Sequence, residues 1–317
     1  MTDHDELDST GLEVWRGGVN TWECDEMGHL NVRFYVARAA EGLVGLAAAM
    51  GLEGAFRSNA GATLLVRDQH IRFLREARSR AALHMTAGIL EIGEHEARVL
   101  QLLHHSATGE LAASFQSVVV HVTARDERPF AWADRTLDRA RSLMVTAPPR
   151  AMPRSLHMGP LDGDVSLARA DQLGMVRLGG GAIQAADCDV FGRMRPELFI
   201  GRVSDGIPTL GAAFRGGEAG AGYNRPANVG GAVLEYRLAQ HAWPRAGDRF
   251  ELRSGLAAVD SRTQRIVHWM LDPATGHAWG TAEAVAIALD LEARKVIPIS
   301  SEDQALLARR VTPGLRM

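Results

Sequence analysis

Residues 23–42 read ECDEMGHLNVRFYVARAAEG, and acidic, cysteine, histidine and asparagine residues crowd its first nine positions. From Phe34 onward, apolar residues recur at helical spacing, which predicts a helix near residues 31–50. Small residues are frequent in this segment, which suits a helix that another element wraps closely. The polar part ahead of it is either a chemical site or a turn that caps the helix, and the stretch alone favours a cap.

The chain contains a second copy of this stretch. Residues 187–206 read DCDVFGRMRPELFIGRVSDG, and Asp25 and Asp189 stand 164 positions apart, as do Gly28 and Gly192. A second match, at an offset of 167, aligns SATGELAASFQSVVV at 106–120 with PATGHAWGTAEAVAI at 273–287. Two matches in the same order indicate a duplicated unit of about 125–130 residues.

Each copy is predicted to contain a strand, the polar turn, a helix and four further strands. The second helix is expected near 195–213. The strands of the first copy are expected near 12–22, 62–74, 80–92, 95–105 and 111–123. Those of the second are expected near 176–186, 229–241, 248–260, 264–271 and 279–290. Glycine-containing turns separate the strands. One helix followed by an antiparallel run predicts the α+β class, with a sheet curled around the helix, rather than a doubly wound fold.

We expect an N-terminal repeat at residues 12–123, a connector at 124–175 and a C-terminal repeat at 176–298. The connector opens with a predicted helix at 132–145, WADRTLDRARSLMV, and continues as an extended surface segment rich in Pro, Gly and Arg. A last helix is expected at 301–310, capped by Ser300 or Ser301. The glycine-rich segment 217–226 predicts a surface loop, with a flap over a binding slot as the alternative.

The composition limits the classes of protein to which the chain can belong. The 317 residues are 46% hydrophobic and carry a formal net charge of −3. This favours a sizeable core and argues against nucleic acid or membrane as a partner, because no overall positive field is present. No apolar run reaches the roughly 18–20 residues that span a bilayer. The first ten residues lack the pattern of a secretory signal, so a cytoplasmic location is expected.

Cys24 and Cys188 are the only cysteines and occupy equivalent positions in the two copies. Their spacing suggests neither a disulfide framework nor a zinc site. Nothing beside them marks an activated thiolate, so a packing role is favoured. Cys24, Asp25 and His29 have the side chains of a metal-ligand set, but the second copy has Arg193 in place of His29, and no metal is expected.

A strand followed by D-x-x-G-H-x-N-x-x-x-Y, a small-residue helix and an antiparallel sheet resembles the hot-dog fold. Asp25, Gly28, His29, Asn31 and Tyr35 carry this motif. Within the fold, the chain resembles the 4-hydroxybenzoyl-CoA thioesterase-like family and the related acyl-acyl-carrier-protein thioesterases. The tandem copy makes it similar to the double hot-dog thioesterases, in which one chain supplies both halves of the usual dimer.

This resemblance implies a thioester hydrolase that acts on an acyl-CoA or an acyl-carrier thioester. It implies no cofactor other than the CoA of the substrate. Hot-dog units usually pair, and the duplication supplies one pair within the chain. A further homodimer of double hot-dogs is therefore an expectation as well.

The resemblance gives Asp25 the role of nucleophile or general base. A place just before a helix is expected to keep Asp25 ionised and to bring the amides around Gly28 to Leu30 near the thioester carbonyl as oxyanion donors. His29 either bonds the thioester oxygen or a water, orients Asp25, or is structural. Asn31 either donates its amide to the substrate or caps the helix.

The second copy keeps Asp189 but has Arg193 and Arg195 where the first copy has histidine and asparagine. We prefer a single working site at Asp25, with Asp189 retained for structure, in a salt bridge to one arginine. In the alternative, Arg193 and Arg195 read a charged end of the substrate or a CoA phosphate. Tyr35 is a further candidate for substrate contact, although a core position with a satisfied hydroxyl suits it better.

Two other functions stay open. One is a non-catalytic acyl-CoA or acyl-binding protein, which the arginines of the second copy support. The other is a hot-dog hydratase or dehydratase, a class that typically shows D-x-N-P-x-H. Here the aspartate and the histidine are four positions apart with Gly28 between them, which argues against that class. The sequence has no G-x-S-x-G segment, so a serine nucleophile is not supported.

Overall fold

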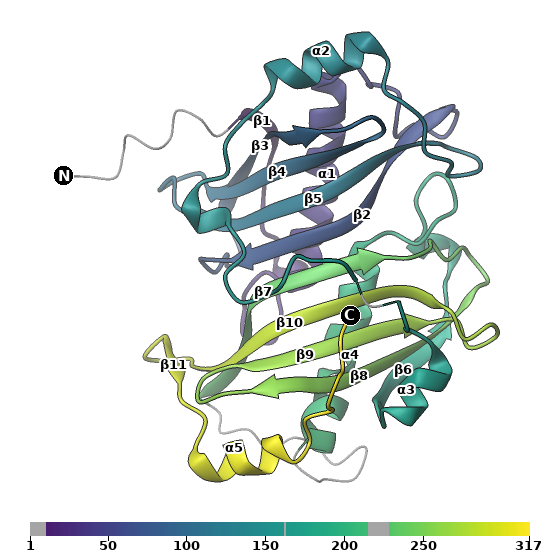
Figure 1. Ribbon diagram of the computed structural model, residues 1–317. Coiled ribbons are helices and arrows are strands. Elements are labelled where there is room, and N and C mark those ends of the chain that lie inside the picture. Colours follow the sequence, from purple (N-terminus) through teal and green to yellow (C-terminus); the bar gives the residue numbers. More distant parts are fainter. Residues whose placement is uncertain (1–10, 162, 215–227) are drawn as a thin grey trace. The chain divides into compact units, whose positions relative to one another are not determined.

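The computed structural model describes residues 11–161, 163–214 and 228–317 (Figure 1). The chain divides into two compact units, residues 1–152 and 153–317. Each unit contains one copy of the repeat, and the division falls inside the predicted connector. The glycine-rich segment at 217–226 lies outside the described residues.

The first unit contains one antiparallel sheet and one long helix. Its elements are β1 (Leu12–Gly18), the 3-10 turn η2 (Thr21–Glu23), α1 (Val32–Ala49), β2 (Ala62–Phe73), β3 (Ala82–Ile92), β4 (Glu96–His105), β5 (Leu111–Thr123), α2 (Asp134–Ser142) and the 3-10 turn η3 (Pro149–Ala151). The strands pair in the order β1-β3-β4-β5-β2. All five strands and the long helix stand where the hydrophobic pattern predicts them.

The second unit repeats this order. Its elements are α3 (Leu167–Gln172), β6 (Val176–Ala182), the 3-10 turn η4 (Ala185–Asp187), α4 (Glu197–Phe214), β7 (Val229–Gln240), β8 (Arg249–Val259), β9 (Gln264–Leu271), β10 (Ala278–Asp290), β11 (Lys295–Ile297) and α5 (Ser301–Ala308). The strands pair as β6-β8-β9-β10-β7, and β11 pairs with β10. Ser300 caps α5, as predicted, by accepting a hydrogen bond from the backbone of Asp303 at 3.0 Å. α3 and β11 were not predicted, because both are too short to show a periodic pattern.

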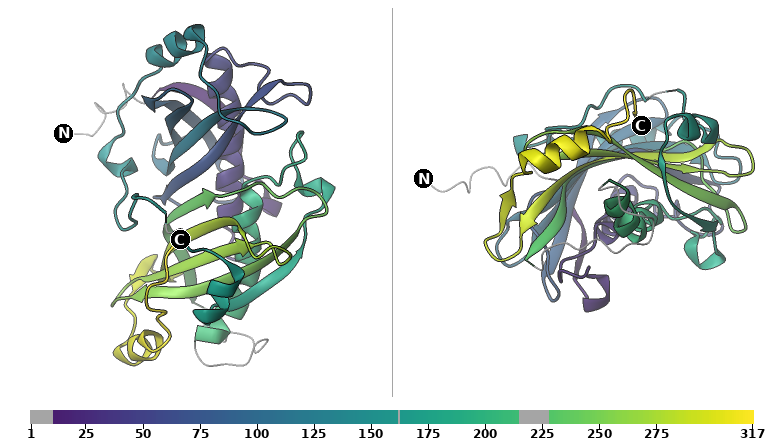
Figure 2. Two further views of the ribbon diagram at one scale, coloured as in Figure 1. Left: turned by 45° about the vertical axis from the view of Figure 1, so that its right-hand side comes forward. Right: turned by 90° about the horizontal axis from the view of Figure 1, so that it is seen from below.

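Each sheet curls around its long helix, and Figure 2 shows α4 in the hollow of its sheet. Small residues permit this close packing. A Cβ atom added at Gly45 would lie 2.4 Å from the carbonyl oxygen of Val14 on β1, and one added at Gly206 would lie 2.9 Å from Leu178 on β6. The expectation of a wrapped helix is confirmed, and so are the α+β class and the tandem hot-dog architecture. None of the described helices is both long and apolar enough to cross a membrane.

The structural repeat continues beyond the predicted strands. The backbone of Met144 pairs with Ile89 on β3, and that of Val311 pairs with Leu256 on β8. Both partners are 167 positions apart, and so are the first residues of α2 and α5. Ala140 of α2 is fully buried in the core that contains Ile89. α2 therefore belongs to the first unit and is not part of a loose surface connector.

Candidate active site

The turn between β1 and α1 is closed by the Asp25 side chain. Its Oδ1 accepts hydrogen bonds from the backbone N–H groups of Met27, at 2.9 Å, and His29, at 3.0 Å. Gly28 has a φ of +76°, a conformation that glycine adopts without steric strain. No atom lies within 4 Å of a Cβ added at Gly28, so the turn is open at this point.

Asp25 is not at the N-terminus of α1, contrary to the prediction. The helix begins at Val32, and its N-cap is Asn31, whose Oδ1 accepts a hydrogen bond from the backbone of Arg33 at 3.0 Å. The capping role therefore belongs to Asn31. Asp25 stands in a separate turn, away from the first residue of the helix.

The backbone amides that were predicted as oxyanion donors are hydrogen-bonded within the protein. The N–H of Gly28 donates to the backbone oxygen of Asp25 at 3.0 Å, and that of His29 donates to the Asp25 side chain. The N–H of Leu30 donates to the backbone oxygen of Ala77 at 2.7 Å. The amides of Gly28 and His29 close the turn and that of Leu30 joins it to Ala77, so all three are engaged within the protein.

The second carboxylate oxygen of Asp25 is the open one. No described residue donates a hydrogen bond to Oδ2, and the side chain is half-buried. The amide nitrogen of Asn31 is likewise without a partner among the described residues, because only its oxygen caps the helix. The turn thus presents one carboxylate oxygen and one amide donor.

A carboxylate from the end of β2 joins this site. Nε2 of the buried His29 lies 3.3 Å from Oε2 of Glu76, which is at the surface. The backbone of His29 also pairs with Arg78, so residues 76–78 run alongside the turn. Glu76 lies outside the recognised motif, and the second copy has Trp243 at the matching position, so neither the motif nor the repeat could have identified it.

Tyr35 is a core residue. Its hydroxyl accepts a hydrogen bond from the backbone N–H of Ala77 at 3.3 Å, and its ring meets Phe73 edge-on. Burial raises the pKa of the Tyr35 phenol well above its usual value. Tyr35 therefore holds the segment that carries Glu76 against α1, and the core alternative describes it better than substrate contact.

The two cysteines are packed rather than activated. The thiols of Cys24 and Cys188 each donate to a backbone oxygen four residues earlier, at 3.5 and 3.4 Å. Burial is the main cause that raises the pKa of both thiols, so the thiol form is favoured over the thiolate. This agrees with the predicted packing role.

The second unit contains an equivalent turn, but the second oxygen of its aspartate is occupied. Oδ1 of Asp189 accepts hydrogen bonds from the backbones of Phe191, at 2.8 Å, and Arg193, at 3.0 Å. Oδ2, however, accepts two more from the guanidinium of Arg193, at 3.0 and 2.9 Å. Only 2% of Arg193 is exposed, and its guanidinium lies over the Phe191 ring. The oxygen that is open on Asp25 is therefore occupied on Asp189.

Arg195 is engaged as well. Its guanidinium lies 3.4 Å from the carboxylate of Glu197 and donates to the backbone oxygen of Ala186 at 3.2 Å. The preferred interpretation, a salt bridge between Asp189 and one of the arginines, matches this geometry. The alternative that Arg193 reads a phosphate does not, because its guanidinium is buried.

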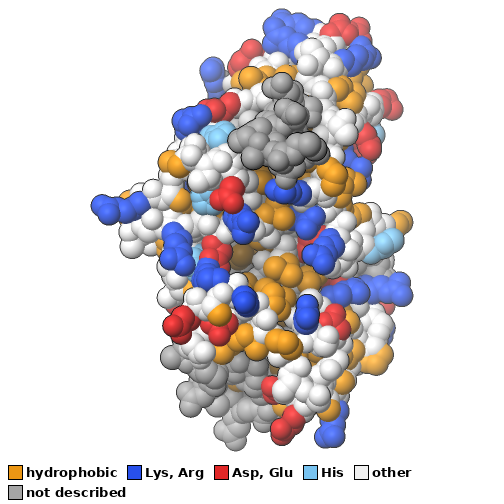
Figure 3. Space-filling view, turned by 90° about the vertical axis from the view of Figure 1, so that its left-hand side faces the viewer, with side chains coloured by type: hydrophobic (Ala, Val, Ile, Leu, Met, Phe, Trp, Pro, Cys, Tyr) orange, Lys and Arg blue, Asp and Glu red, His pale blue; other side chains and the backbone are white. Residues whose placement is uncertain are grey.

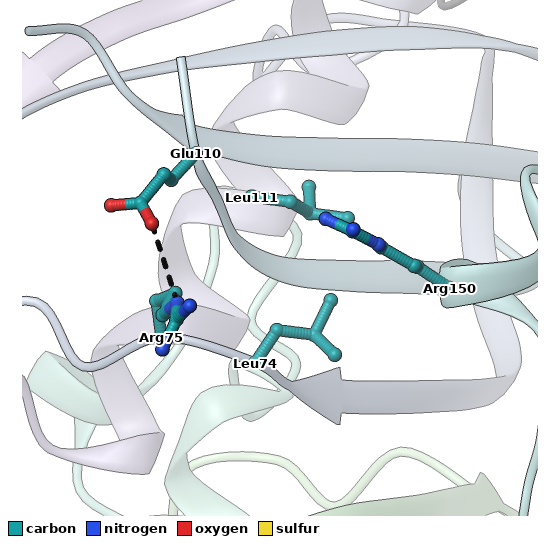
Figure 4. A pocket seen from close by; sticks show the side chains of 5 residues that line it. All are labelled: Leu74, Arg75, Glu110, Leu111 and Arg150. Carbon is teal, nitrogen blue, oxygen red and sulfur yellow. Dashed lines mark ion pairs between the residues drawn. The ribbon is translucent and has the colours of Figure 1, made fainter. Parts of the chain in front are cut away.

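A pocket of about 280 Å³ lies at the surface of the first unit (Figure 4). Its lining comes from the residues after β2, the start of β5 and η3: Leu74, Arg75, Glu110, Leu111 and Arg150. Arg75 and Glu110 form an ion pair at 3.5 Å across its mouth. Arg75 directly precedes Glu76, so the wall of the pocket continues into the segment beside the Asp25 turn.

Among residues 11–161, 163–214 and 228–317, no group of three or more His, Cys, Asp or Glu side chains is arranged to hold a metal ion.

Comparisons with known proteins agree with this architecture. The family model of the thioesterase-like superfamily matches residues 19–140 and 183–308, which cover most of both units. No curated protein matches the chain.

Three solved structures of similar size share the fold. A putative oleoyl thioesterase from Lactobacillus plantarum is 12% identical, with a TM-score of 0.65, and the match covers 89% of this chain and 97% of that one. A 12:0-ACP thioesterase from Umbellularia californica is 13% identical, with a TM-score of 0.65 and coverage of 90% and 97%. An acyl-ACP thioesterase from Bacteroides thetaiotaomicron is 9% identical, with a TM-score of 0.62 and coverage of 86% and 96%.

Proposed function

Because the chain belongs to the thioesterase-like superfamily and is a thioester hydrolase, we propose that it hydrolyses acyl-CoA to a free acid and CoA at the Asp25 turn. The observation that carries this assignment is the contrast between the two copies. Oδ2 of Asp25 has no partner among the described residues, whereas Oδ2 of Asp189 is held by Arg193. Of the two equivalent aspartates, Asp25 is the one that offers a carboxylate oxygen to a substrate.

Two routes start from this oxygen. As a general base, Oδ2 removes a proton from a water whose oxygen attacks the thioester carbonyl carbon. As a nucleophile, it attacks that carbon itself, and water then hydrolyses the acyl-aspartyl anhydride. In both routes the C–S bond breaks and the CoA sulfur leaves as a thiolate that takes up a proton. The two hydrogen bonds to Oδ1 hold the carboxylate in one orientation in either case.

His29, Glu76 and Asn31 complete the site. The Glu76 carboxylate lies 3.3 Å from Nε2 of His29 and holds the imidazole in one orientation beside the turn. From there the polar imidazole stabilises the negative charge that develops on the thioester oxygen. The amide of Asn31 supplies a neutral hydrogen-bond donor for the same oxygen, in place of the engaged backbone amides.

The test is the release of free thiol from a panel of acyl-CoA thioesters with short, long and aromatic acyl groups. Asp25→Asn is expected to lower kcat by at least about 100-fold, the scale of general-base catalysis. Glu26→Gln changes an exposed acid in the same turn and serves as the matched control, with turnover expected at the wild-type level. Glu76→Gln is expected to lower kcat less than His29→Gln, because it acts through the histidine.

Unchanged turnover in Asp25→Asn would rule out the assignment. A wild-type protein that binds CoA tightly and turns over no thioester would instead support the non-catalytic binding function. In single-turnover hydrolysis in H₂¹⁸O, ¹⁸O in the Asp25 carboxylate would demonstrate the nucleophilic route with water attacking the aspartyl carbon of the anhydride, because the general-base route places the label only in the product acid. A cytoplasmic location and pairing into a homodimer remain part of the proposal, and the second is tested by the mass of the native assembly.

A further inference from the structure

A basic and aromatic patch borders the Asp25 turn, and it consists of Trp22, Arg78 and Arg80. The hydroxyls of Thr21 and Ser79 lie 3.0 Å apart, so the neighbours of these two residues are brought together. In addition, the backbone N–H of Arg80 donates to the oxygen of residue 19 at 2.8 Å. Residues 77–81 therefore run beside residues 19–30, with the two arginines flanking the point of contact.

The patch is unusually open. Trp22 is 77% exposed, although a large aromatic side chain is favoured in a buried place. Arg78 and Arg80 are exposed, and no described residue forms a hydrogen bond or an ion pair with either guanidinium. Basic and apolar side chains are mixed on the face of the molecule shown in Figure 3. The patch thus combines an exposed indole with two guanidinium groups that have no partner among the described residues, which gives it the capacity to bind a ligand.

The second unit serves as an internal control, because it builds the same segments around an occupied Asp189. The positions equivalent to the three patch residues hold Ala186, Arg245 and Gly247. Of these, Arg245 is turned back onto the protein and donates to the backbone oxygen of Phe191 at 2.9 Å. The patch is therefore confined to the unit whose aspartate is open.

The conformation of Arg80 adds an independent observation. Its φ is +72°, in the left-handed region that glycine tolerates and that other residues enter only at a conformational cost. The equivalent Gly247 has a φ of +97°, so the fold requires this conformation in both units. Glycine is the residue without strain here. An arginine kept at such a position indicates that its side chain is used.

We propose that this patch binds the 3′-phospho-ADP end of acyl-CoA, with the adenine stacked on Trp22 and the phosphates held by Arg78 and Arg80. Stacking on an aromatic ring holds a base, and guanidinium groups bind phosphate through paired hydrogen bonds. Three peptide units separate Trp22 from Asp25, a span of at most about 11 Å. The flexible pantetheine arm can bridge it and bring the thioester to the turn. A phosphopantetheine on a carrier protein has no adenine, so the exposed indole favours CoA as the carrier.

This inference rests on the proposed function, and the experiment keeps the two apart by comparing acyl-CoA with the N-acetylcysteamine thioester of the same acid. The truncated thioester has the reacting carbonyl and lacks the nucleotide. Trp22→Ala and Arg80→Gly introduce the residue types that the second unit has at the equivalent positions, and Arg78→Ala removes the other guanidinium of the patch. Each is expected to lower the ratio of kcat/KM for acyl-CoA to kcat/KM for the truncated thioester by at least about fivefold.

Arg125→Ala, at an exposed arginine elsewhere in the first unit, is the control and should leave the ratio unchanged. Arg80→Gly should also unfold at a temperature equal to or above that of the wild type, because glycine removes the strain. A purely structural role for Arg80 predicts no change in the ratio. Titration calorimetry with adenosine 3′,5′-bisphosphate measures binding without turnover, and its affinity should fall in the same three variants.

An unchanged ratio together with unchanged bisphosphate affinity overturns the inference. Loss of activity on an acyl-carrier-protein thioester, with acyl-CoA unaffected, overturns it in favour of a carrier-protein surface. If the wild type hydrolyses neither thioester, the proposed function fails, and the bisphosphate titration still decides whether the patch binds the nucleotide.

Discussion

The substitutions Asp25→Asn and Asp189→Asn should have opposite effects on activity and on stability. The two carboxylates occupy equivalent turns of the two units, and each accepts two backbone hydrogen bonds through Oδ1. Their second oxygens differ, because that of Asp189 holds the buried Arg193. Asparagine keeps the shape of the side chain and the acceptor that closes the turn. The substitution therefore tests the charge and the second oxygen alone.

The expected loss of stability in Asp189→Asn follows from the burial of Arg193. Arg193 is 2% exposed, and Asp189→Asn would leave its positive charge buried, with an amide donor facing the guanidinium. Stranding a buried charge in this way costs about 3–5 kcal/mol of unfolding free energy. At about 2–4 °C per kcal/mol for a unit of this size, the unfolding temperature should fall by roughly 6–20 °C. Asp25→Asn strands no charge, so its unfolding free energy should stay within about 1 kcal/mol of wild type.

Calorimetry and the thiol-release assay are run on both variants. Asp25→Asn should be stable and inactive, whereas Asp189→Asn should be less stable and should retain the turnover of the folded protein. The double variant Asp189→Asn/Arg193→Met removes both members of the pair and should recover most of the lost stability, because no charge remains buried. Wild-type stability in Asp189→Asn would refute the reasoning about Arg193. Loss of turnover in Asp189→Asn alone would assign the chemistry to the second unit.

Three further outcomes are expected. Gly45→Val should lower the unfolding free energy measured in urea by about 1–3 kcal/mol, because its Cβ would meet the Val14 backbone. Gly54→Ala is the control, and it should be near neutral because no atom lies within 4 Å of the added Cβ. Burial lowers the pKa of His268 to about 3, so the unfolded chain binds one more proton than the folded one between pH 6.5 and 3. The free energy of unfolding should then decrease as the pH falls below 6.5, and His268 should contribute about 1.4 kcal/mol per pH unit to this decrease. His268→Gln should flatten that part of the curve of stability against pH. An unchanged curve would contradict the lowered pKa of His268. The raised pKa of the Cys24 thiol predicts slow alkylation by iodoacetamide at pH 7–8 in the native protein and faster alkylation after unfolding. Equal rates would contradict the raised pKa.

The repeated architecture could be predicted because its signals are local in the chain. Alternating apolar residues and glycine turns placed β2 to β5 and β7 to β10 close to their observed bounds. The duplication then gave each element of one copy a counterpart in the other. α2 was assigned to a connector instead, because its sequence does not resemble that of α5. The backbone pairings of Met144 with Ile89 and of Val311 with Leu256 show that the two helices are equivalent, and the burial of Ala140 shows that α2 belongs to the first core.

The site was predicted only in part, for a related reason. The motif singled out Asp25, which stays a proposal as the working aspartate, but two side chains near the start of α1 were both suitable as the cap of the helix. Which of them caps the helix depends on where the helix begins, and the structure assigns the cap to Asn31. The backbone amides that the position of Asp25 suggested as donors are hydrogen-bonded within the turn and to Ala77, a residue in the segment that follows β2.

The order of residues is enough to specify a tandem α+β fold and to single out two equivalent aspartates, because helical periodicity, strand alternation and repeat spacing are properties of neighbours along the chain. The difference between the two aspartates arises in three dimensions. Arg193 folds back four positions and is buried against Asp189, whereas Glu76 reaches His29 from the segment that follows β2, nearly fifty positions further along the chain. Which carboxylate oxygen stays open is decided by burial and by contacts between distant segments, and no local pattern encodes these.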